Sequence, residues 1–128
     1  MKWCFFILLL VGCSKSTDPQ QGISFTEVET SIAPTVCGSE NPSQILEVNG
    51  TGLALFDYDN DNDLDLFVVN ASNEPCRLYE NVSVDSIVFV DVTEKLGINI
   101  QGQGWANGVA VGDVNGDGFD DVYITYHG

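Results

Sequence analysis

The feature that most constrains this chain is an acidic segment that occurs twice. Residues 52–70 and residues 108–126 align without gaps over their second halves, at an offset of 56 residues. A second landmark, residues 25–30, recurs at residues 89–94 in the same order relative to the acidic segment. Two landmarks that recur in one order indicate an internal repeat, so we expect tandem structural units.

Each copy of the repeat carries oxygen-bearing side chains at alternate positions of a short loop. Positions 1, 3, 5 and 9 are Asp57, Asp59, Asp61 and Asp65 in the first loop, and Asp113, Asn115, Asp117 and Asp121 in the second. Alternate residues of a tight loop can turn their oxygens toward one centre, and Ca²⁺ binds roughly 6 to 8 such ligands in a flexible geometry. Mg²⁺ is a poorer match because it prefers strict octahedral geometry and retains its waters. The pattern therefore predicts two Ca²⁺ sites.

Two further loop positions fit the same interpretation. Position 7, which is Asp63 or Phe119, would offer its backbone carbonyl, so its side chain is free to vary. Position 6 is expected to need a positive φ, which Gly118 adopts without strain and which Asn62 tolerates better than most residues. A solvated acidic surface is the alternative, but ordinary acidic runs do not alternate twice at identical spacing.

Short apolar segments flank both loops and predict strands rather than helices. They are rich in β-branched residues, are bounded by Gly and Asp, and span residues 53–56, 66–69, 109–111 and 122–125. We expect these strands to be buried on both faces, and each loop to join the two strands of a hairpin. An EF-hand would instead need flanking helices and a bidentate acid at position 12, where the sequence has Val68 and Ile124.

Each copy of the repeat consists of a strand, the loop Asp-x-Asp/Asn-x-Asp-Gly/Asn-x-x-Asp and a second strand. This arrangement resembles the FG-GAP and VCBS repeats of integrin-like β-propellers. Residues 77–81 and 89–97 are also similar to repeats of bacterial proteins related to the cartilage acidic protein, the ASPIC/UnbV type. The resemblance covers residues 23–128. It implies a β-propeller fold and Ca²⁺ binding through the loop positions named above.

Counting strands against a propeller blade predicts an all-β, partial β-propeller. A blade has four antiparallel strands, and residues 52–92 supply four: the first loop hairpin, residues 77–81 and residues 87–92. Residues 108–126 supply two strands of the next blade, and residues 23–28 match the outer strand of a preceding one. Because propellers close with roughly 4 to 8 blades, we expect the sequence to be the front part of a longer protein. A stand-alone sheet stabilised by calcium and a disulfide is the alternative.

We interpret the N-terminal residues as a targeting signal followed by a flexible tether. Lys2 precedes an apolar run, Trp3–Val11, which is too short to span a bilayer and is typical of a secretory signal. The run ends in Leu-Val-Gly-Cys, which resembles the lipobox of bacterial lipoproteins and implies lipidation of Cys13. An ordinary cleaved signal is the alternative. We expect a signal peptide at residues 1–12, a flexible tether at residues 13–22 and the repeat region at residues 23–128.

This interpretation places the protein in the cell envelope, lipid-anchored to a bacterial membrane and facing the periplasm or the exterior. Cys4 would leave with the signal, so Cys37 and Cys76 remain as an even pair in an oxidising compartment. We predict a disulfide between them, with two separate thiols as the alternative. The scarcity of His and Cys offers no zinc site.

The charge balance narrows the functional classes. The chain has 19 acidic and 4 basic residues and a formal net charge of −15, which excludes the clustered Lys and Arg that nucleic-acid binding requires. The single histidine, His127, is the penultimate residue, and no nucleophile with a neighbouring base can be singled out. We therefore expect a Ca²⁺-binding adhesion or binding module with a protein or glycan partner, and not an enzyme. The alternative is the N-terminal or accessory part of a larger secreted enzyme whose catalytic part lies elsewhere.

Overall fold

The computed structural model describes residues 3–4, 27–36, 51–71, 74–98, 100 and 104–127. Within these residues the regular secondary structure consists of β-strands alone, which confirms the predicted all-β class. The described part of the chain contains no helix with the length and apolar character needed to cross a membrane.

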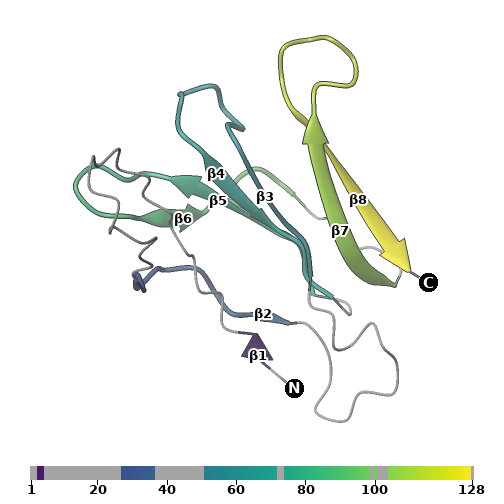
Figure 1. The fold of residues 1–128 in the computed structure, drawn as a ribbon, viewed down its shortest axis with the longest axis horizontal. Helices are drawn as coiled ribbons and strands as arrows, with labels where there is room; N and C mark the ends of the chain where they lie inside the picture. Colours follow the sequence, from purple (N-terminus) through teal and green to yellow (C-terminus); the bar gives the residue numbers. More distant parts are fainter. Residues whose placement is uncertain are drawn as a thin grey trace, which may run out of the picture.

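Four consecutive strands form one antiparallel sheet in sequence order (Figure 1). They are β3 (Leu53–Phe56), β4 (Asp65–Val68), β5 (Arg77–Asn81) and β6 (Phe89–Asp91). The register places Leu55 opposite Leu66 and Phe67 opposite Leu78. A four-stranded antiparallel meander is the complete blade that strand counting predicts.

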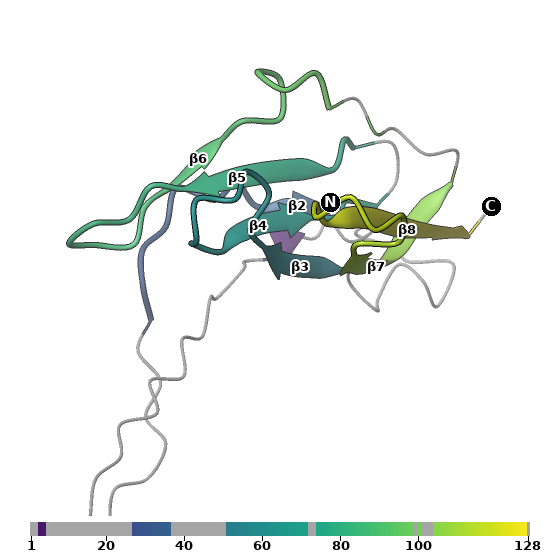
Figure 2. The same ribbon diagram turned by 90° about the horizontal axis from the view of Figure 1, so that it is seen from above.

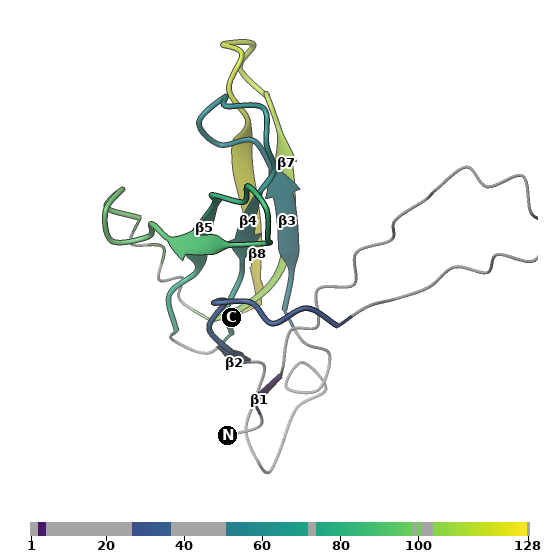
Figure 3. The same cartoon turned by 90° about the vertical axis from the view of Figure 1, so that its left-hand side faces the viewer.

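A second hairpin lies next to β3, the first strand of this sheet. Its strands are β7 (Trp105–Gly112) and β8 (Asp121–His127), and their register shifts between Ala106 and Gly108. β7 lies next to β3, as Figures 1 and 3 show. One complete blade followed by two strands of the next makes this chain a partial β-propeller.

The part of the chain before the blade differs from the prediction. Two-residue strands β1 (Trp3–Cys4) and β2 (Thr35–Val36) pair with each other. Residues 27–34 form no strand, so the predicted strand at residues 23–28 is wrong in its described part, and residues 23–26 lie outside the described residues.

Residues 31–33 nevertheless contact the outer half of the blade. The Ser31 hydroxyl donates to the Phe89 carbonyl, and the Ala33 N–H donates to the Tyr79 hydroxyl oxygen at 3.2 Å. Figure 2 shows the segment approaching β6. The segment therefore occupies the side of the blade where the preceding strand was expected, although without strand pairing.

Each face of the blade carries its own hydrophobic cluster, because successive side chains of a strand point to opposite faces. On one face the buried residues are Phe56, Phe67, Val69, Cys76, Leu78 and Val92, and Ala106, Val109, Val111, Val122 and Ile124 of the β7–β8 hairpin pack against them. On the other face they are Leu66, Val68, Tyr79 and Phe89, with Ile32 and Ile87 packed against them. The hairpin thus docks on one face of the blade and residues 31–33 on the other.

The expectation that the loop-flanking strands are buried on both faces is correct for β4 only. Every residue of β4 is buried, since it has a strand on each side and a cluster on each face. β3 alternates between exposed residues and residues that are partly or fully buried, β7 is mostly partly buried, and β8 is a mixture of exposed and partly buried residues. The expectation is wrong for these three strands because each is covered on one face and not on the other.

We predict that Leu66→Ala destabilises the protein strongly while Leu64→Ala is nearly neutral. The Leu66 side chain is fully buried, whereas Leu64, two residues earlier, is 55% exposed. Truncation of a buried leucine costs about 2–5 kcal/mol, and an exposed substitution changes stability by about 0.5 kcal/mol or less. Urea unfolding followed by tryptophan fluorescence measures the difference. Equal midpoints for the two variants would contradict the packing of β4.

Candidate metal centre

The two acidic loops lie at the same edge of the molecule. The first connects β3 to β4, the second connects β7 to β8, and β3 lies beside β7. Both loops project from the same end of the strands, at the top of Figures 1 and 3. The sequence repeat therefore becomes a spatial repeat of two equivalent loops.

In the first loop, the carboxylate of Asp57 accepts the backbone hydrogen bonds of the turn. Its Oδ1 accepts the Asp61 N–H at 3.0 Å and its Oδ2 accepts the Asn62 N–H at 2.9 Å. Oδ1 of Asp61 then accepts the Asp63 N–H at 3.0 Å. These side chains supply the acceptors that a tight loop cannot provide from its own backbone.

The second loop repeats these bonds at the same positions. Oδ1 of Asp113 accepts the Asp117 N–H at 3.2 Å, its Oδ2 accepts the Gly118 N–H at 2.9 Å, and Oδ1 of Asp117 accepts the Phe119 N–H at 2.9 Å. Asp113 also accepts the Gly116 N–H at 2.7 Å. The bonds from Gly118 and Gly116 hold the pKa of Asp113 below its ordinary value, because they favour the ionised carboxylate.

The backbone conformation is shared as well. Position 6 has a positive φ in both loops, 74° at Asn62 and 88° at Gly118, which confirms the prediction from the sequence. Position 4 also has a positive φ, 62° at Asn60 and 80° at Gly116. The sequence pattern did not single out position 4, although Asn and Gly are the two residues that adopt this region most readily.

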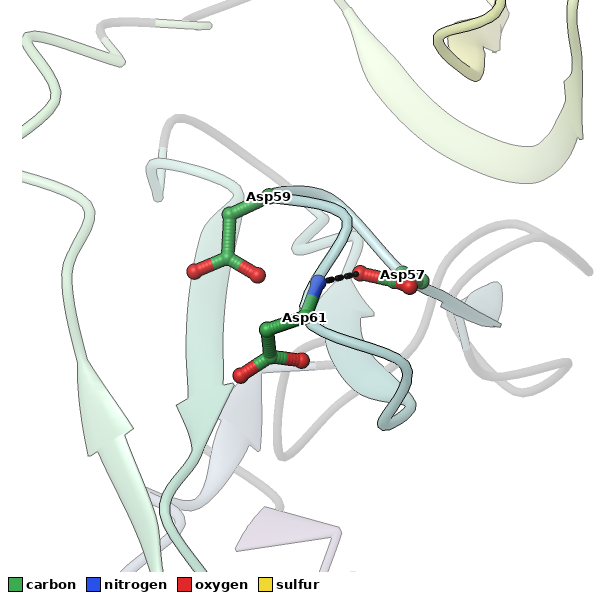
Figure 4. A group of neighbouring side chains, drawn as sticks. All are labelled: Asp57, Asp59 and Asp61. Atoms are coloured by element: carbon green, nitrogen blue, oxygen red, sulfur yellow. Dashed lines mark hydrogen bonds between the residues drawn. The ribbon is translucent and has the colours of Figure 1, made fainter.

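The first loop brings three carboxylates together. Asp57, Asp59 and Asp61 each place an oxygen within 4.8 Å of the others, and they are the one such acidic or His/Cys group among the described residues. Figure 4 shows the carboxylates of Asp59 and Asp61 side by side and the bond from the Asp61 N–H to Asp57. These three side chains could hold a metal ion.

Two of the first-loop carboxylates have pKa values above the ordinary value for aspartate. Loss of hydration, followed by repulsion from Asp61 and Asp65, raises the pKa of Asp59 and the pKa of Asp63 above their ordinary values. Oδ1 of Asp63 is also buried without a hydrogen-bond partner. Asp63 lies outside the group formed by Asp57, Asp59 and Asp61, but a buried carboxylate oxygen without a partner is one that an oxygen-ligating cation would satisfy. Sequence reasoning assigned only the backbone carbonyl of Asp63 to the site and missed this side chain.

Position 9 has a structural role in addition to its predicted one. Asp65 is buried, its Oδ2 accepts the Tyr58 N–H at 3.0 Å, and its Oδ1 accepts the Asn81 N–H at 2.8 Å. In the second loop, Oδ2 of Asp121 accepts the Val114 N–H at 3.1 Å, which is the equivalent of the Tyr58 bond. Asp65 therefore connects the loop to β5 through a hydrogen bond.

A neighbouring polar group, Glu80, was not expected from the sequence. Its Oε2 accepts the Tyr58 hydroxyl at 3.2 Å and lies 3.6 Å from the Lys95 ammonium nitrogen. Burial and the adjacent charge of Glu80 raise the pKa of Tyr58 to about 12, so this hydroxyl keeps its proton at neutral pH. Glu80 lies on β5, outside the loop motif, and its contacts depend on strand pairing that a loop pattern does not specify.

The second loop does not gather three acidic groups in the same way. Position 3 is Asn115, whose Oδ1 accepts the Asp117 N–H at 2.8 Å and whose amide donates to Oδ2 of Asp117 at 3.0 Å. The side chain of Phe119 at position 7 is 57% exposed. The second site therefore shares the loop conformation of the first but offers fewer carboxylates.

Two of the three predicted cysteine positions lie outside the described residues. Nothing is described at Cys13 or Cys37, and Cys76 is buried within the first hydrophobic cluster. The lipid site and the disulfide between Cys37 and Cys76 stay predictions.

Comparison with known families identifies one match. The model of a family described as an FG-GAP-like repeat matches residues 57–124, which is just over half of the chain and includes both acidic loops. Searches of curated proteins and of solved structures found no match.

We predict that Gly118→Ala destabilises the folded protein while Gly112→Ala does not. Neither added methyl group would meet an atom within 4 Å, but Gly118 has a φ of 88° and Gly112 has no positive φ. A left-handed conformation costs a non-glycine residue about 1–2 kcal/mol. Thermal unfolding of both variants under one buffer condition measures the difference. A Gly118→Ala midpoint at or above that of Gly112→Ala would contradict the loop conformation.

Proposed function

We propose that this chain, which belongs to the FG-GAP-like repeat family, is a calcium-binding interaction module of the cell envelope. The family match and the blade architecture support a β-propeller binding module.

The carboxylate cluster of Asp57, Asp59 and Asp61 is the observation that carries the calcium proposal. Their oxygens lie within 4.8 Å of one another, and the pKa of Asp59 is raised by lost hydration and by its neighbours. Like charges held this close together repel one another. A bound divalent cation would convert this repulsion into attraction.

Ca²⁺ fits the donor set better than other cations. Every candidate ligand is a carboxylate, an amide oxygen or a backbone carbonyl, which suits a hard cation that accepts irregular coordination. The residues that would hold it are the predicted sets in both loops, with the Asp63 carboxylate added in the first. The first loop should bind more tightly, because Asn115 gives the second loop a neutral ligand where the first has Asp59.

The proposed partner is a protein or a glycan, and the module itself is proposed to be non-enzymatic. Binding modules present loops at the edges of a rigid scaffold, and metal binding would rigidify the loop edge of both hairpins. The acidic net charge of −15 argues against nucleic acid as the partner. The proposed setting is a bacterial membrane reached through lipid on Cys13, which would hold the module in the periplasm or at the exterior.

We predict that Asp59→Asn changes stability in opposite directions with and without Ca²⁺. The folded state raises the pKa of Asp59, so its ionisation weakens folding as pH rises through that pKa, and at neutral pH the charge is destabilising without a cation. The neutral variant should therefore unfold at a higher temperature than the wild type in chelator. In saturating Ca²⁺ it should unfold at a lower temperature, because it has lost a ligand.

The matched control is Asp85→Asn, which removes one negative charge from an exposed residue outside both loops. The unfolding temperature of this control should differ little from that of the wild type, both in chelator and in saturating Ca²⁺. Asp117→Asn tests the second loop and should reduce the number of ions bound per chain. A parallel response of Asp59→Asn and Asp85→Asn to Ca²⁺ would rule out the first site.

We predict that Cys13→Ala releases the protein from the membrane fraction. Stable anchoring needs more than one acyl chain, because each buried CH₂ group contributes only about 0.8 kcal/mol, and Cys13 is the proposed attachment residue. Cys4→Ala, in the proposed signal peptide, is the matched control and should leave the protein membrane-bound. Fractionation with labelled palmitate follows both variants. Label that remains on Cys13→Ala would contradict the lipid-anchor proposal.

A further inference from the structure

Tyr58, the second residue of the first loop, is held to the blade at three points. Its ring packs against the first hydrophobic cluster, its N–H donates to Oδ2 of Asp65 at 3.0 Å, and its hydroxyl donates to Oε2 of Glu80 at 3.2 Å. Tyr58 stands between Asp57 and Asp59, two of the three carboxylates drawn in Figure 4. Contacts that fix Tyr58 therefore also fix the backbone that carries these two carboxylates.

Glu80 can act as a fixed point for the first loop because it lies on a paired strand. β5 pairs with β4 and β6, Glu80 is opposite Val90 of β6, and its side chain is only 25% exposed. The next residue, Asn81, donates its N–H to Oδ1 of Asp65 at 2.8 Å. Adjacent residues of β5 thus contact the beginning of the loop at Tyr58 and its end at Asp65.

The second loop has only the backbone half of this arrangement. The Val114 N–H donates to Oδ2 of Asp121 at 3.1 Å, as the Tyr58 N–H does to Asp65. Valine has no hydroxyl, so the bond from Tyr58 to the β5 carboxylate has no counterpart at Val114, whatever lies beside that loop. The backbone bond belongs to the repeat, whereas the hydroxyl bond is particular to the first loop.

We propose that Tyr58 and Glu80 are positioning residues for the cation of the first loop, an inference that rests on the calcium function proposed for this loop. Neither residue is a ligand in this proposal. The hydrogen bond between them holds the loop in the conformation that brings its carboxylates together. A loop that is already ordered loses less conformational freedom when an ion binds, so pre-organisation raises the affinity.

Three substitutions separate this hydrogen bond from the other properties of the two residues. Tyr58→Phe removes the hydroxyl and keeps the ring that packs on the hydrophobic cluster. Glu80→Gln removes the charge and keeps an oxygen that accepts hydrogen bonds, whereas Glu80→Met is also neutral and unbranched but has only a weak acceptor. Both Glu80 variants lose the same charge, so the difference between them reports the acceptor alone.

Heteronuclear NMR of the full chain during a CaCl₂ titration reads the two loops separately. The N–H of Asn62 donates to Asp57 in the first loop, and the N–H of Gly118 donates to Asp113 in the second. A cation bound by either aspartate should shift the amide signal beside it. Each loop therefore has its own reporter, and the second loop is an internal control in every sample.

Tyr58→Phe and Glu80→Met should each weaken Ca²⁺ binding at the Asn62 reporter by roughly threefold to tenfold, which corresponds to one hydrogen bond of ordinary strength. The dissociation constant read at Gly118 should not change. Glu80→Gln should bind more tightly than Glu80→Met, because its amide oxygen can still accept the Tyr58 hydroxyl.

The double variant of Tyr58→Phe and Glu80→Met tests whether the two residues act through one contact. It should bind no more weakly than Glu80→Met alone, because both substitutions remove the same bond. A further loss as large as that of Tyr58→Phe in the wild-type chain would contradict the proposal.

Lys95→Met is the matched control, because it removes the other partner of Glu80 and leaves the bond from Tyr58 in place. The Lys95 ammonium lies 3.6 Å from Glu80 and its side chain is 70% exposed, so this ion pair should contribute little. Binding at Asn62 should be no weaker than in the wild type. A loss as large as that of Glu80→Met would assign the positioning to the ion pair instead.

Three further results would overturn the proposal while the wild type binds Ca²⁺ at both reporters. They are wild-type affinity at Asn62 in Tyr58→Phe, equal affinities of Glu80→Gln and Glu80→Met, and equal weakening at Asn62 and Gly118, which general damage to the fold would produce. If Glu80→Met fails to fold, Tyr58→Phe still decides the first and third comparisons. A wild type in which neither amide responds to CaCl₂ would refute the calcium function itself, so the two failures are distinguishable.

Discussion

The hydrogen bonds accepted by the first aspartate of each loop are the interaction on which both hairpins depend. Asp57 and Asp113 use both carboxylate oxygens to accept backbone N–H groups from the far side of the turn. Without these acceptors the exposed loop N–H groups would have only water as a partner, and the turn would lose its internal hydrogen bonds. The same carboxylates concentrate negative charge in a small volume, so the interaction that shapes the loop also creates the need for a cation.

The loop and the hydrophobic core are linked through one buried residue. Asp65 ends the first loop, begins β4, and joins Tyr58 to Asn81 through its two oxygens. The neighbouring Leu66 lies in the core between the blade and residues 31–33. Loop geometry is therefore anchored to sheet packing, and we expect cation binding at the loop to stabilise the whole blade and not only the turn.

The local sequence pattern was sufficient to predict several strands and the conformation of the acidic loops. The strand at Leu53–Phe56, the strand at Arg77–Asn81 and the positive φ at Asn62 follow from nearby residues, and the structure confirms them. Features that depend on distant partners could not be predicted. Contacts of Glu80 with Tyr58 and Lys95, the one-sided cover of β3, and the irregular path of residues 27–34 all depend on which segments meet in space.

In a calorimetric titration of the full chain with CaCl₂, joined to thermal unfolding of the same samples, we expect two ions bound per chain and a rise in the unfolding midpoint with Ca²⁺ concentration, since a ligand at about 100 times its Kd stabilises by about 2.7 kcal/mol per site. The rise should exceed that produced by Mg²⁺ at equal concentration. No binding heat and an unfolding midpoint that is identical in Ca²⁺ and in chelator would contradict calcium binding by the two loops.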